Sequence, residues 1–186
     1  MTTVVAVLNQ KGGSGKTTLS TNIARQFEMD NERCLLVDSD PQGSARDWHA
    51  ASDGELVKVV GLDRPTLDKD LKAVKSGYDW IIIVGAPQLQ HMAISAIKGA
   101  DLVLIPVQPS PYDVWACADL VDLIKARQEV TDGQPQAAFI ISRMIKNTLI
   151  SRDIREALDE YELPIFKNGT TQRAPQSQVL LIISSG

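Results

Sequence analysis

The chain has 186 residues, of which 44% are hydrophobic and 23% charged, and its formal net charge is −4. These values are typical of a soluble globular protein and are enough for one domain with a full core. The negative total excludes a chain that is basic throughout, so any nucleic-acid-binding surface has to be local. No apolar run reaches the roughly 18 residues of a membrane span, and the strand-like N-terminus predicts no signal peptide.

Apolar strand-like runs alternate with helical patterns along the chain. The runs at 34–37, 80–84 and 102–105 are continuously apolar, as in strands that are buried on both faces. The pattern predicts a doubly wound α/β fold, a mostly parallel sheet with helices on both faces. We expect strands at residues 3–9, 34–38, 56–60, 79–84, 101–107 and 137–142. We expect helices at residues 16–29, 43–51, 66–76, 91–99, 111–128 and 151–161.

A glycine-rich stretch follows the first strand and precedes a helical repeat of Leu19, Ile23 and Phe27. Strand, glycine-rich loop and helix is the context of a phosphate-binding loop. The glycines let successive N–H groups turn inward, and the helix N-terminus adds partial positive charge. Lys16 is expected to reach the β- and γ-phosphates, and the Thr17 hydroxyl to bind Mg²⁺. The expected nucleotide-binding residues of the loop are Gly12, Gly13, Ser14, Gly15, Lys16, Thr17 and Thr18.

The loop departs from the strict G-x-x-x-x-G-K-[ST] pattern, because Gln10 stands where the first glycine would be. It reads K-G-G-x-G-K-T-T, with an additional lysine at Lys11. This resembles the deviant Walker A motif of the ParA/MinD family of ATPases. The resemblance implies a P-loop NTPase fold that binds ATP or ADP, and a Lys11 that crosses the interface of an ATP-bound homodimer to the partner's nucleotide. The alternative is a glycine-rich turn with two solvated lysines.

Two carboxylates, Asp38 and Asp40, close the second predicted strand. Ligands gather at this edge of open α/β sheets, and Mg²⁺ takes oxygen ligands while keeping several waters. The stretch V-D-x-D-P-Q-G is similar to the family's second motif, which implies that Asp38 belongs to the Mg²⁺ shell and that Asp40 positions the attacking water. The alternative is a polar turn that starts a helix.

The predicted strand at 79–84 ends in Val-Gly-Ala-Pro and is similar to the family's Walker B strand. Relatives carry an aspartate at the position of Val84. Asp79 cannot replace it, because the rise of a strand places it about 16 Å away. Since a Walker B carboxylate helps to hold Mg²⁺ at the γ-phosphate, we expect impaired hydrolysis that rests on Asp38 and Asp40. A nucleotide-gated DNA-binding or scaffold switch without hydrolysis remains the alternative.

The stretch I-P-V-Q-P-S-P-Y-D predicts the start of a helix, with Ser110 as N-cap, Pro111 at the first helical position and Asp113 complementing the helix dipole. The helix is expected to run to residue 128 and to bury Val114, Ala118, Val121 and Ile124. The stretch also resembles a family motif near the nucleotide and the dimer face. The resemblance makes it a contact region, with Pro109 among the nucleotide-binding residues, and gives it no catalytic role.

Basic residues are more frequent after residue 142, where the resemblance implies contacts to DNA without sequence preference. Arg152 with Glu156, and Arg155 with Asp159, are spaced as ordinary surface pairs of a helix. The better candidates for phosphate contacts lack such partners and are Lys146, Lys167 and Arg173. The domain is expected to end at residue 173, and the uncharged tail at 174–186 is interpreted as truncated or altered, with a possible edge strand over 179–183.

The resemblance is strongest to small ParA-type partition proteins and covers residues 1–173. It implies an ATPase, with Lys11, Lys16 and Asp40 as catalytic residues, that dimerises on ATP, binds nonspecific DNA and is stimulated by a ParB-type centromere-binding adaptor at the nucleoid in the cytoplasm. The cargo stays open: a plasmid, a chromosome or a protein organelle.

Two rivals within the fold fit the sequence less well. A MinD-like membrane-cycling ATPase requires a basic amphipathic C-terminal helix, but no lysine or arginine follows Arg173, so no membrane partner is expected. An iron–sulfur reductase requires bridging cysteines in loops. Cys34 and Cys117 are predicted to be core thiols in a strand and a helix instead.

Overall fold

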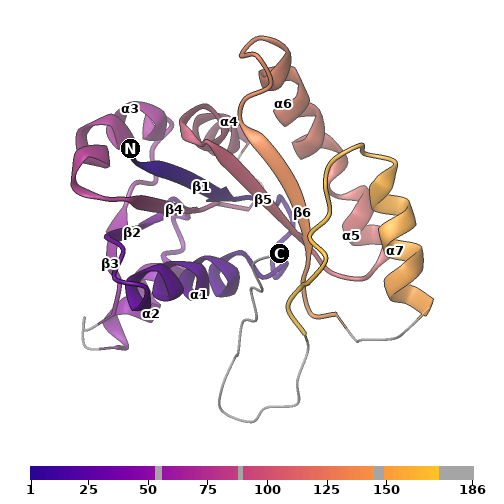
Figure 1. Cartoon of the computed structure of the whole chain (residues 1–186), viewed down its shortest axis with the longest axis horizontal. Coiled ribbons are helices and arrows are strands. Elements are labelled where there is room, and N and C mark those ends of the chain that lie inside the picture. Colours follow the sequence, from indigo (N-terminus) through magenta and orange to yellow (C-terminus); the bar gives the residue numbers. More distant parts are fainter. Residues whose placement is uncertain (53–55, 88–89, 145–148, 172–186) are drawn as a thin grey trace.

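The computed structural model describes residues 1–52, 56–87, 90–144 and 149–171. Six strands, all paired in parallel, form one sheet in the order β3-β2-β4-β1-β5-β6 (Figure 1). The doubly wound α/β fold is confirmed. The strands are β1 (Thr3–Val7), β2 (Cys34–Asp38), β3 (Lys58–Gly61), β4 (Trp80–Val84), β5 (Leu102–Val107) and β6 (Gln136–Ile141).

Helices cover both faces of the sheet, with α1 and α2 on one face and α3, α4 and α6 on the other (Figure 1). Their bounds are α1 (Lys16–Met29), α2 (Ser44–Ala50), α3 (Leu67–Val74), the short 3₁₀ turn η1 (Lys75–Gly77), α4 (Gln90–Gly99), α5 (Pro111–Trp115), α6 (Ala118–Glu129) and α7 (Leu149–Asp159). Over the described ranges, none of these helices combines the length and apolar character needed to cross a bilayer.

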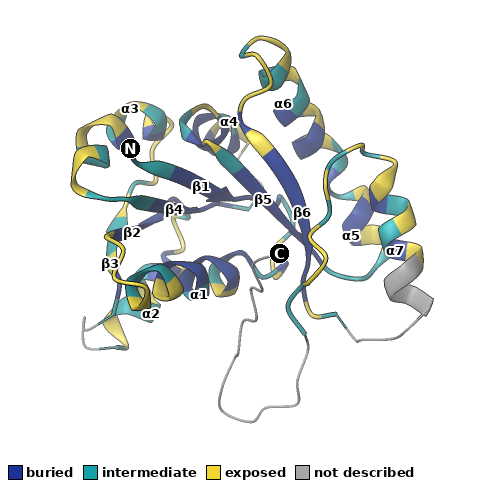
Figure 2. Ribbon diagram, in the orientation of Figure 1, coloured by how far each residue is buried: buried dark blue, intermediate teal, exposed yellow. Residues whose placement is uncertain are grey.

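The central strands are buried on both faces, as their continuous apolar character predicts (Figure 2). Ile81 and Ile83 of β4 pack with α3, α4 and α6, whereas Ile82 and Val84 pack with α1. Fully burying one such side chain contributes about 1.5–3 kcal/mol. The sheet is therefore held rigidly between its helices, and its carboxyl edge can position loops.

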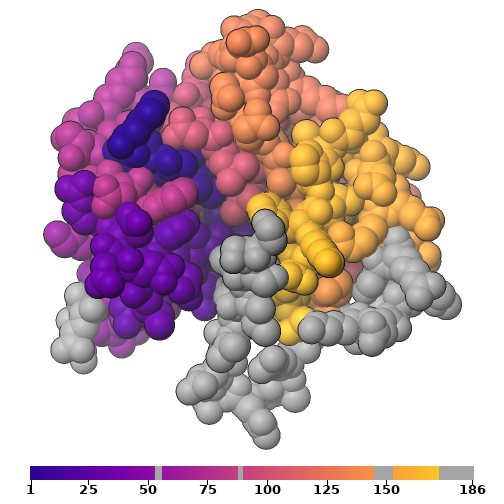
Figure 3. Space-filling model, in the orientation of Figure 1, coloured from indigo at the N-terminus to yellow at the C-terminus, as the bar shows by residue number. Residues whose placement is uncertain are grey.

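The chain returns to the sheet after α7 and runs beside β6, where the yellow and orange atoms meet (Figure 3). The amide of Phe139 donates to Pro164 O at 2.8 Å, and the amide of Phe166 donates to Phe139 O at 2.9 Å. Farther on, a Cβ at Gly169 would lie 2.0 Å from Ile141 O, so only glycine permits this approach. The outer edge of β6 is thus partly covered.

The single helix expected over 111–128 is wrong, because two helices, α5 and α6, occupy this range. The amide of Cys117 turns back to Val114 O at 3.0 Å, and the Tyr161 hydroxyl donates to the same carbonyl at 3.0 Å. This tighter turn ends α5 before α6 begins. Val114, Val121 and Ile124 are buried as expected, while Ala118 is half-buried.

Candidate functional site

The glycine-rich loop joins β1 to α1 at the carboxyl edge of the sheet. Gly13 and Gly15 have φ angles of 73° and 101°, in the left-handed region that favours glycine. Lys16, Thr17 and Thr18 form the first turn of α1. The backbone therefore adopts the curl that a phosphate-binding loop requires.

Neighbouring side chains bind the outward-facing carbonyls of this loop. Gln108 Nε2 donates to Gly13 O at 2.6 Å, and Ser142 Oγ donates to Ser14 O at 2.7 Å. Asn9 Oδ1 accepts from the amide of Lys11 at 2.8 Å and fixes the start of the loop. Within the described residues, the amides of the loop from Gly12 to Gly15 have no acceptor. These unpaired donors fit an anion such as a phosphate.

Asn9, Gln108 and Ser142 are supporting residues that motif reasoning missed. Each is the first or second polar residue after an apolar strand, β1, β5 or β6. Parallel strands end at the same edge, so this shared position is a signal that could have found them.

Lys16 is buried, with its ammonium 3.0 Å from the carbonyl of Lys11. Burial lowers the pKa of Lys16, and the Asp40 carboxylate acts in the opposite direction. Two of the predicted catalytic residues, Lys16 at the start of α1 and Asp40 in the loop after β2, thus interact electrostatically at the same edge of the sheet.

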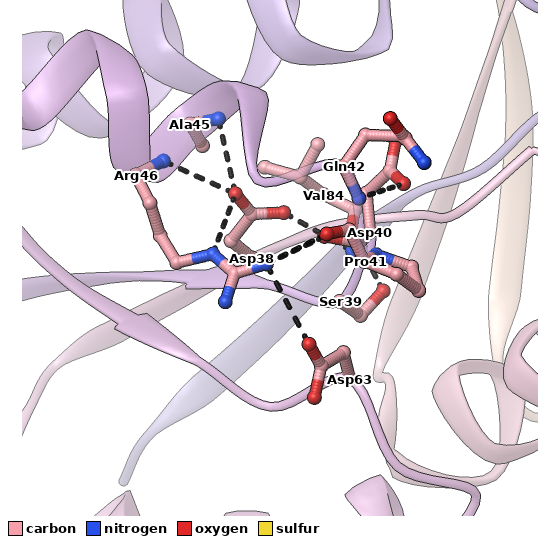
Figure 4. Close-up of polar contacts among 9 residues, drawn as sticks. All are labelled: Asp38, Ser39, Asp40, Pro41, Gln42, Ala45, Arg46, Asp63 and Val84. Atoms are coloured by element: carbon pink, nitrogen blue, oxygen red, sulfur yellow. Dashed lines mark hydrogen bonds and ion pairs between the residues drawn. The ribbon is translucent and has the colours of Figure 1, made fainter.

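Asp38 is fully buried at the start of α2 (Figure 4). Its Oδ2 accepts from the amides of Ala45 at 3.0 Å and Arg46 at 3.1 Å, and its Oδ1 accepts from the amide of Asp40 at 3.1 Å. Asp38 therefore shapes the turn that begins α2. This agrees with the alternative interpretation of the stretch as a polar turn that starts a helix. Its role toward Mg²⁺ stays a prediction.

Asp40 is half-buried, and its Oδ1 accepts from the amide of Gln42 at 3.0 Å. This leaves its carboxylate at the surface of the same edge as the glycine-rich loop. A carboxylate here can accept a proton or a hydrogen bond from a water molecule.

Val84 lies beside Asp38 in the register of β2 and β4, and opposite Val7 of β1. Its side chain is buried in the cluster that includes Leu19 of α1. The expected carboxylate position is therefore apolar and closely packed. Asp79 lies at the other end of β4, where two hydrogen bonds from the side chain of Arg33 and one from its amide lower the pKa of Asp79 to about 2.

Lys11 forms an ion pair within its own subunit, 2.6 Å from Asp113 Oδ2. The Asp113 side chain is only 3% exposed, and its Oδ1 has no partner among the described residues. Asp113 was expected only to complement a helix dipole. The pairing with Lys11 joins residues 102 positions apart and could not be read from local spacing.

Pro109 is half-buried in the loop between β5 and α5, next to the Gln108 that holds the glycine-rich loop. A cavity of about 40 Å³ adjoins the other side of that loop. It is lined by Gly15, Thr18, Leu19, Ile140, Ser142, Arg143 and Thr170. Apolar and polar groups thus continue the site from the loop toward β6.

Of the three predicted DNA contacts, the structure describes only Lys167. Lys146 and Arg173 lie outside the described residues, as does the tail with its predicted edge strand. Lys167 is exposed on the segment beside β6. Arg155 Nη2 donates to Phe166 O at 3.1 Å and to Lys167 O at 2.8 Å, so it supports the backbone of this segment.

A divalent cation fits the site only together with a ligand that brings oxygen atoms of its own. Across the ranges that the structure covers, no three histidine, cysteine or acidic side chains are grouped to hold a metal. Mg²⁺ bound with nucleotide phosphates needs only one or two protein oxygens and keeps several waters. Thr17 and Asp38 could supply these oxygens. Both cysteines are free, buried thiols, as expected, and burial raises the pKa of each to about 12.

Comparison with known proteins identifies relatives over nearly the whole chain. A family model for the CobQ/CobB/MinD/ParA nucleotide binding domain matches residues 5–174. The chain is 31% identical to the maintenance of carboxysome distribution protein A of Halothiobacillus neapolitanus, over 91% of this chain and 80% of that protein. It is 29% identical to the sporulation initiation inhibitor protein Soj of Bacillus subtilis, over 68% of this chain and 66% of that protein.

Solved structures show the same fold at low sequence identity. Cobyrinic acid a,c-diamide synthase from Mycobacterium smegmatis with bound ADP and magnesium has a TM-score of 0.78 at 23% identity, covering 93% of this chain and 88% of that chain. Cyanothece McdA without nucleotide gives 0.76 at 17% identity, with coverages of 93% and 87%. pNOB8 ParA bound to nonspecific DNA gives 0.66 at 18% identity, with coverages of 90% and 79%.

Proposed function

The chain belongs to the CobQ/CobB/MinD/ParA nucleotide-binding domain family, and we propose that it is a ParA-type ATPase that positions or partitions a cargo along DNA. The observation that carries the proposal is the glycine-rich loop, whose carbonyls are bound by Gln108 and Ser142 while its amides from Gly12 to Gly15 have no acceptor in the part of the chain that the structure describes. This loop suits nucleotide phosphates. Lys11 adds a second positive charge, and Asp40 adds a carboxylate that can orient a water molecule, whereas a simple phosphate-binding site needs neither.

The proposed reaction is the transfer of the γ-phosphoryl group of ATP to water. An oxygen of water bonds to the γ-phosphorus, the bond to the β,γ-bridging oxygen breaks, and the products are ADP and phosphate. The loop amides and the Lys16 ammonium balance phosphate charge, which is the main means of catalysis for this reaction. Asp40 orients the water, and Lys11 of the second subunit adds charge.

Mg²⁺ would be held by the Thr17 hydroxyl and by Asp38, the latter through water. When bound, the ion neutralises charge on the phosphate oxygens. Asp38 is suited to the indirect position, because its carboxylate is already engaged by three backbone amides.

The proposed partners are a second copy of the chain, nonspecific DNA and a ParB-type adaptor that stimulates hydrolysis. The relatives support this choice, since one is named for carboxysome distribution and another structure is of a ParA on nonspecific DNA. Lys146, Lys167 and Arg173 are the proposed phosphate contacts, with the cell's nucleoid as the place of action. A protein organelle and a chromosome are both compatible cargoes.

Phosphate release from Mg²⁺-ATP, with and without nonspecific DNA, tests the function. We expect slow release that rises with DNA and adaptor, and that falls by about a hundredfold in Asp40→Asn, because the water loses its orienting carboxylate. Asp47→Asn on the exposed side of α2 is the matched control and should keep the original rate. ATP-dependent DNA binding without any phosphate release would instead indicate the non-hydrolysing switch. The valine at position 84 is the reason to consider this alternative.

The Lys11–Asp113 ion pair should oppose dimerisation, because Lys11 must leave Asp113 to reach the partner's nucleotide. The Lys11 side chain is 40% exposed but that of Asp113 only 3%, so the pair contributes about 1 kcal/mol or more, and two pairs are broken per dimer. Asp113→Asn should therefore tighten the ATP-bound dimer roughly tenfold or more, measured by analytical ultracentrifugation. Asp119→Asn, an exposed carboxylate on α6, is the control. A weaker dimer in Asp113→Asn would mean that Asp113 also acts within the dimer.

A further inference from the structure

Arg46, in the first turn of α2, folds back over the loop that carries Asp40 (Figure 4). Its Nη2 donates to the carbonyl of Asp40 at 2.9 Å and to that of Pro41 at 3.4 Å. Its Nε lies 3.6 Å from Asp38 Oδ2, and its Nη2 lies 3.5 Å from Asp63 Oδ2 beyond β3. One guanidinium thus joins the Asp40 loop to the buried carboxylate of Asp38 and to the exposed carboxylate of Asp63.

Two glycines make room for this guanidinium. A Cβ at Gly61 would lie 2.9 Å from Arg46 Nη1, and one at Gly43 would lie 3.1 Å from Nε. Gly43 also has a φ of 72° and forms the turn before α2. The half-exposed guanidinium therefore lies close to the backbone at Gly43 and Gly61, which limits the directions in which its fork can point.

The side chain is not needed to start α2. Asp38 already accepts the amides of Ala45 and Arg46, and these are backbone contacts that any residue at position 46 keeps. Among the described residues, the polar contacts of the Arg46 side chain are with the Asp40 loop, Asp38 and Asp63. Its contacts are thus directed at the placement of that loop.

We propose that Arg46 is a positioning residue for Asp40, which fixes the direction of the Asp40 carboxylate by holding the carbonyls of Asp40 and Pro41. The inference rests on the proposed ATP hydrolysis and adds a residue that no sequence motif marked. A small displacement of the group that orients the reacting water lowers the rate strongly, because the water is then no longer held in the geometry needed for attack.

The test compares Arg46→Ala, Arg46→Lys and Gly61→Ala with Arg64→Ala, an exposed arginine that pairs with Asp70 on neighbouring α3. We expect Arg46→Ala to lower kcat roughly ten- to hundredfold while the Kd for ATP changes less than about threefold. Arg46→Lys should recover part of the loss, because lysine keeps the charge but not the fork. Gly61→Ala should give a smaller loss by displacing the guanidinium, and Arg64→Ala should give none.

Two further readouts separate positioning from general destabilisation. In an Asp40→Asn background, Arg46→Ala should lower kcat by less than about a further threefold, because both changes act on the same water. Hydrogen exchange in the nucleotide-free protein should speed up at the Gln42 amide, which Asp40 Oδ1 accepts. An unchanged kcat, additive losses or unchanged exchange would each overturn the proposal. If the unaltered chain releases no phosphate, the proposed function fails, and the exchange comparison still decides whether Arg46 fixes the loop.

Discussion

Lys16→Gln abolishes ATP-dependent dimerisation and lowers phosphate release by at least about a hundredfold, as the expected result of removing the buried ammonium from the loop. Lys16 is 7% exposed and contacts the loop carbonyl of Lys11, and glutamine keeps a polar side chain of nearly the same size without the charge. The substitution therefore removes charge at the phosphates with little change of shape. Light scattering and ultracentrifugation with and without Mg²⁺-ATP measure the dimer.

The control for Lys16→Gln is Lys72→Gln, which removes a charge from an exposed position on α3. It should dimerise like the unaltered chain. A dimer that persists in Lys16→Gln would contradict the nucleotide switch, because assembly would then be independent of the phosphates.

The second large effect is expected from Val84→Asp, which should raise kcat at saturating Mg²⁺-ATP roughly tenfold or more. The new carboxylate would stand beside Asp38 in the sheet register, at the position where the resemblance to the ParA/MinD family predicts an aspartate. It would also replace a side chain that is 1% exposed, so the nucleotide-free protein should be less stable and should melt at a lower temperature. Mg²⁺-ATP should restore part of the lost stability, since it offers the carboxylate a partner.

Val84→Asn separates charge from polarity at this position. It introduces a similar volume and polar atoms without the negative charge, so it should destabilise the protein while leaving kcat low. A rate for Val84→Asp equal to that of the unaltered chain would show that Asp38 and Asp40 suffice. Turnover in Val84→Asp alone would instead mean that this chain is held as a switch.

Local patterns predict the centre of this fold well. The expected bounds of the helix at 16–29 and the strand at 34–38 agree with α1 and β2 to the residue. Continuous apolar runs and glycine punctuation determine these elements over a few neighbouring positions. The break between α5 and α6 could not be predicted in this way, because the turn there is contacted by Tyr161, which lies 47 positions from Val114 in the sequence.

The same distinction holds within the site. The motifs predict the glycine-rich loop and the two carboxylates, since those residues are adjacent in sequence. They miss the contacts of Ser142 with Ser14 and of Lys11 with Asp113, which join residues 128 and 102 positions apart. Val84 is a further case: the resemblance predicts a carboxylate that the sequence lacks there, and only the structure shows that Val84 packs in an apolar cluster.

The segment that runs beside β6 limits how two copies of this chain can assemble. It bonds to the outer side of that strand through Phe139 and Ile141, which leaves fewer backbone groups there to recruit a strand from another molecule. The opposite border of the sheet is β3, which has only four residues and begins with the exposed Lys58. Neither border favours a continuous intermolecular sheet. The proposed ATP-bound dimer therefore has to form through another surface, and the loop-bearing end is the one where a nucleotide bound between two copies could control it.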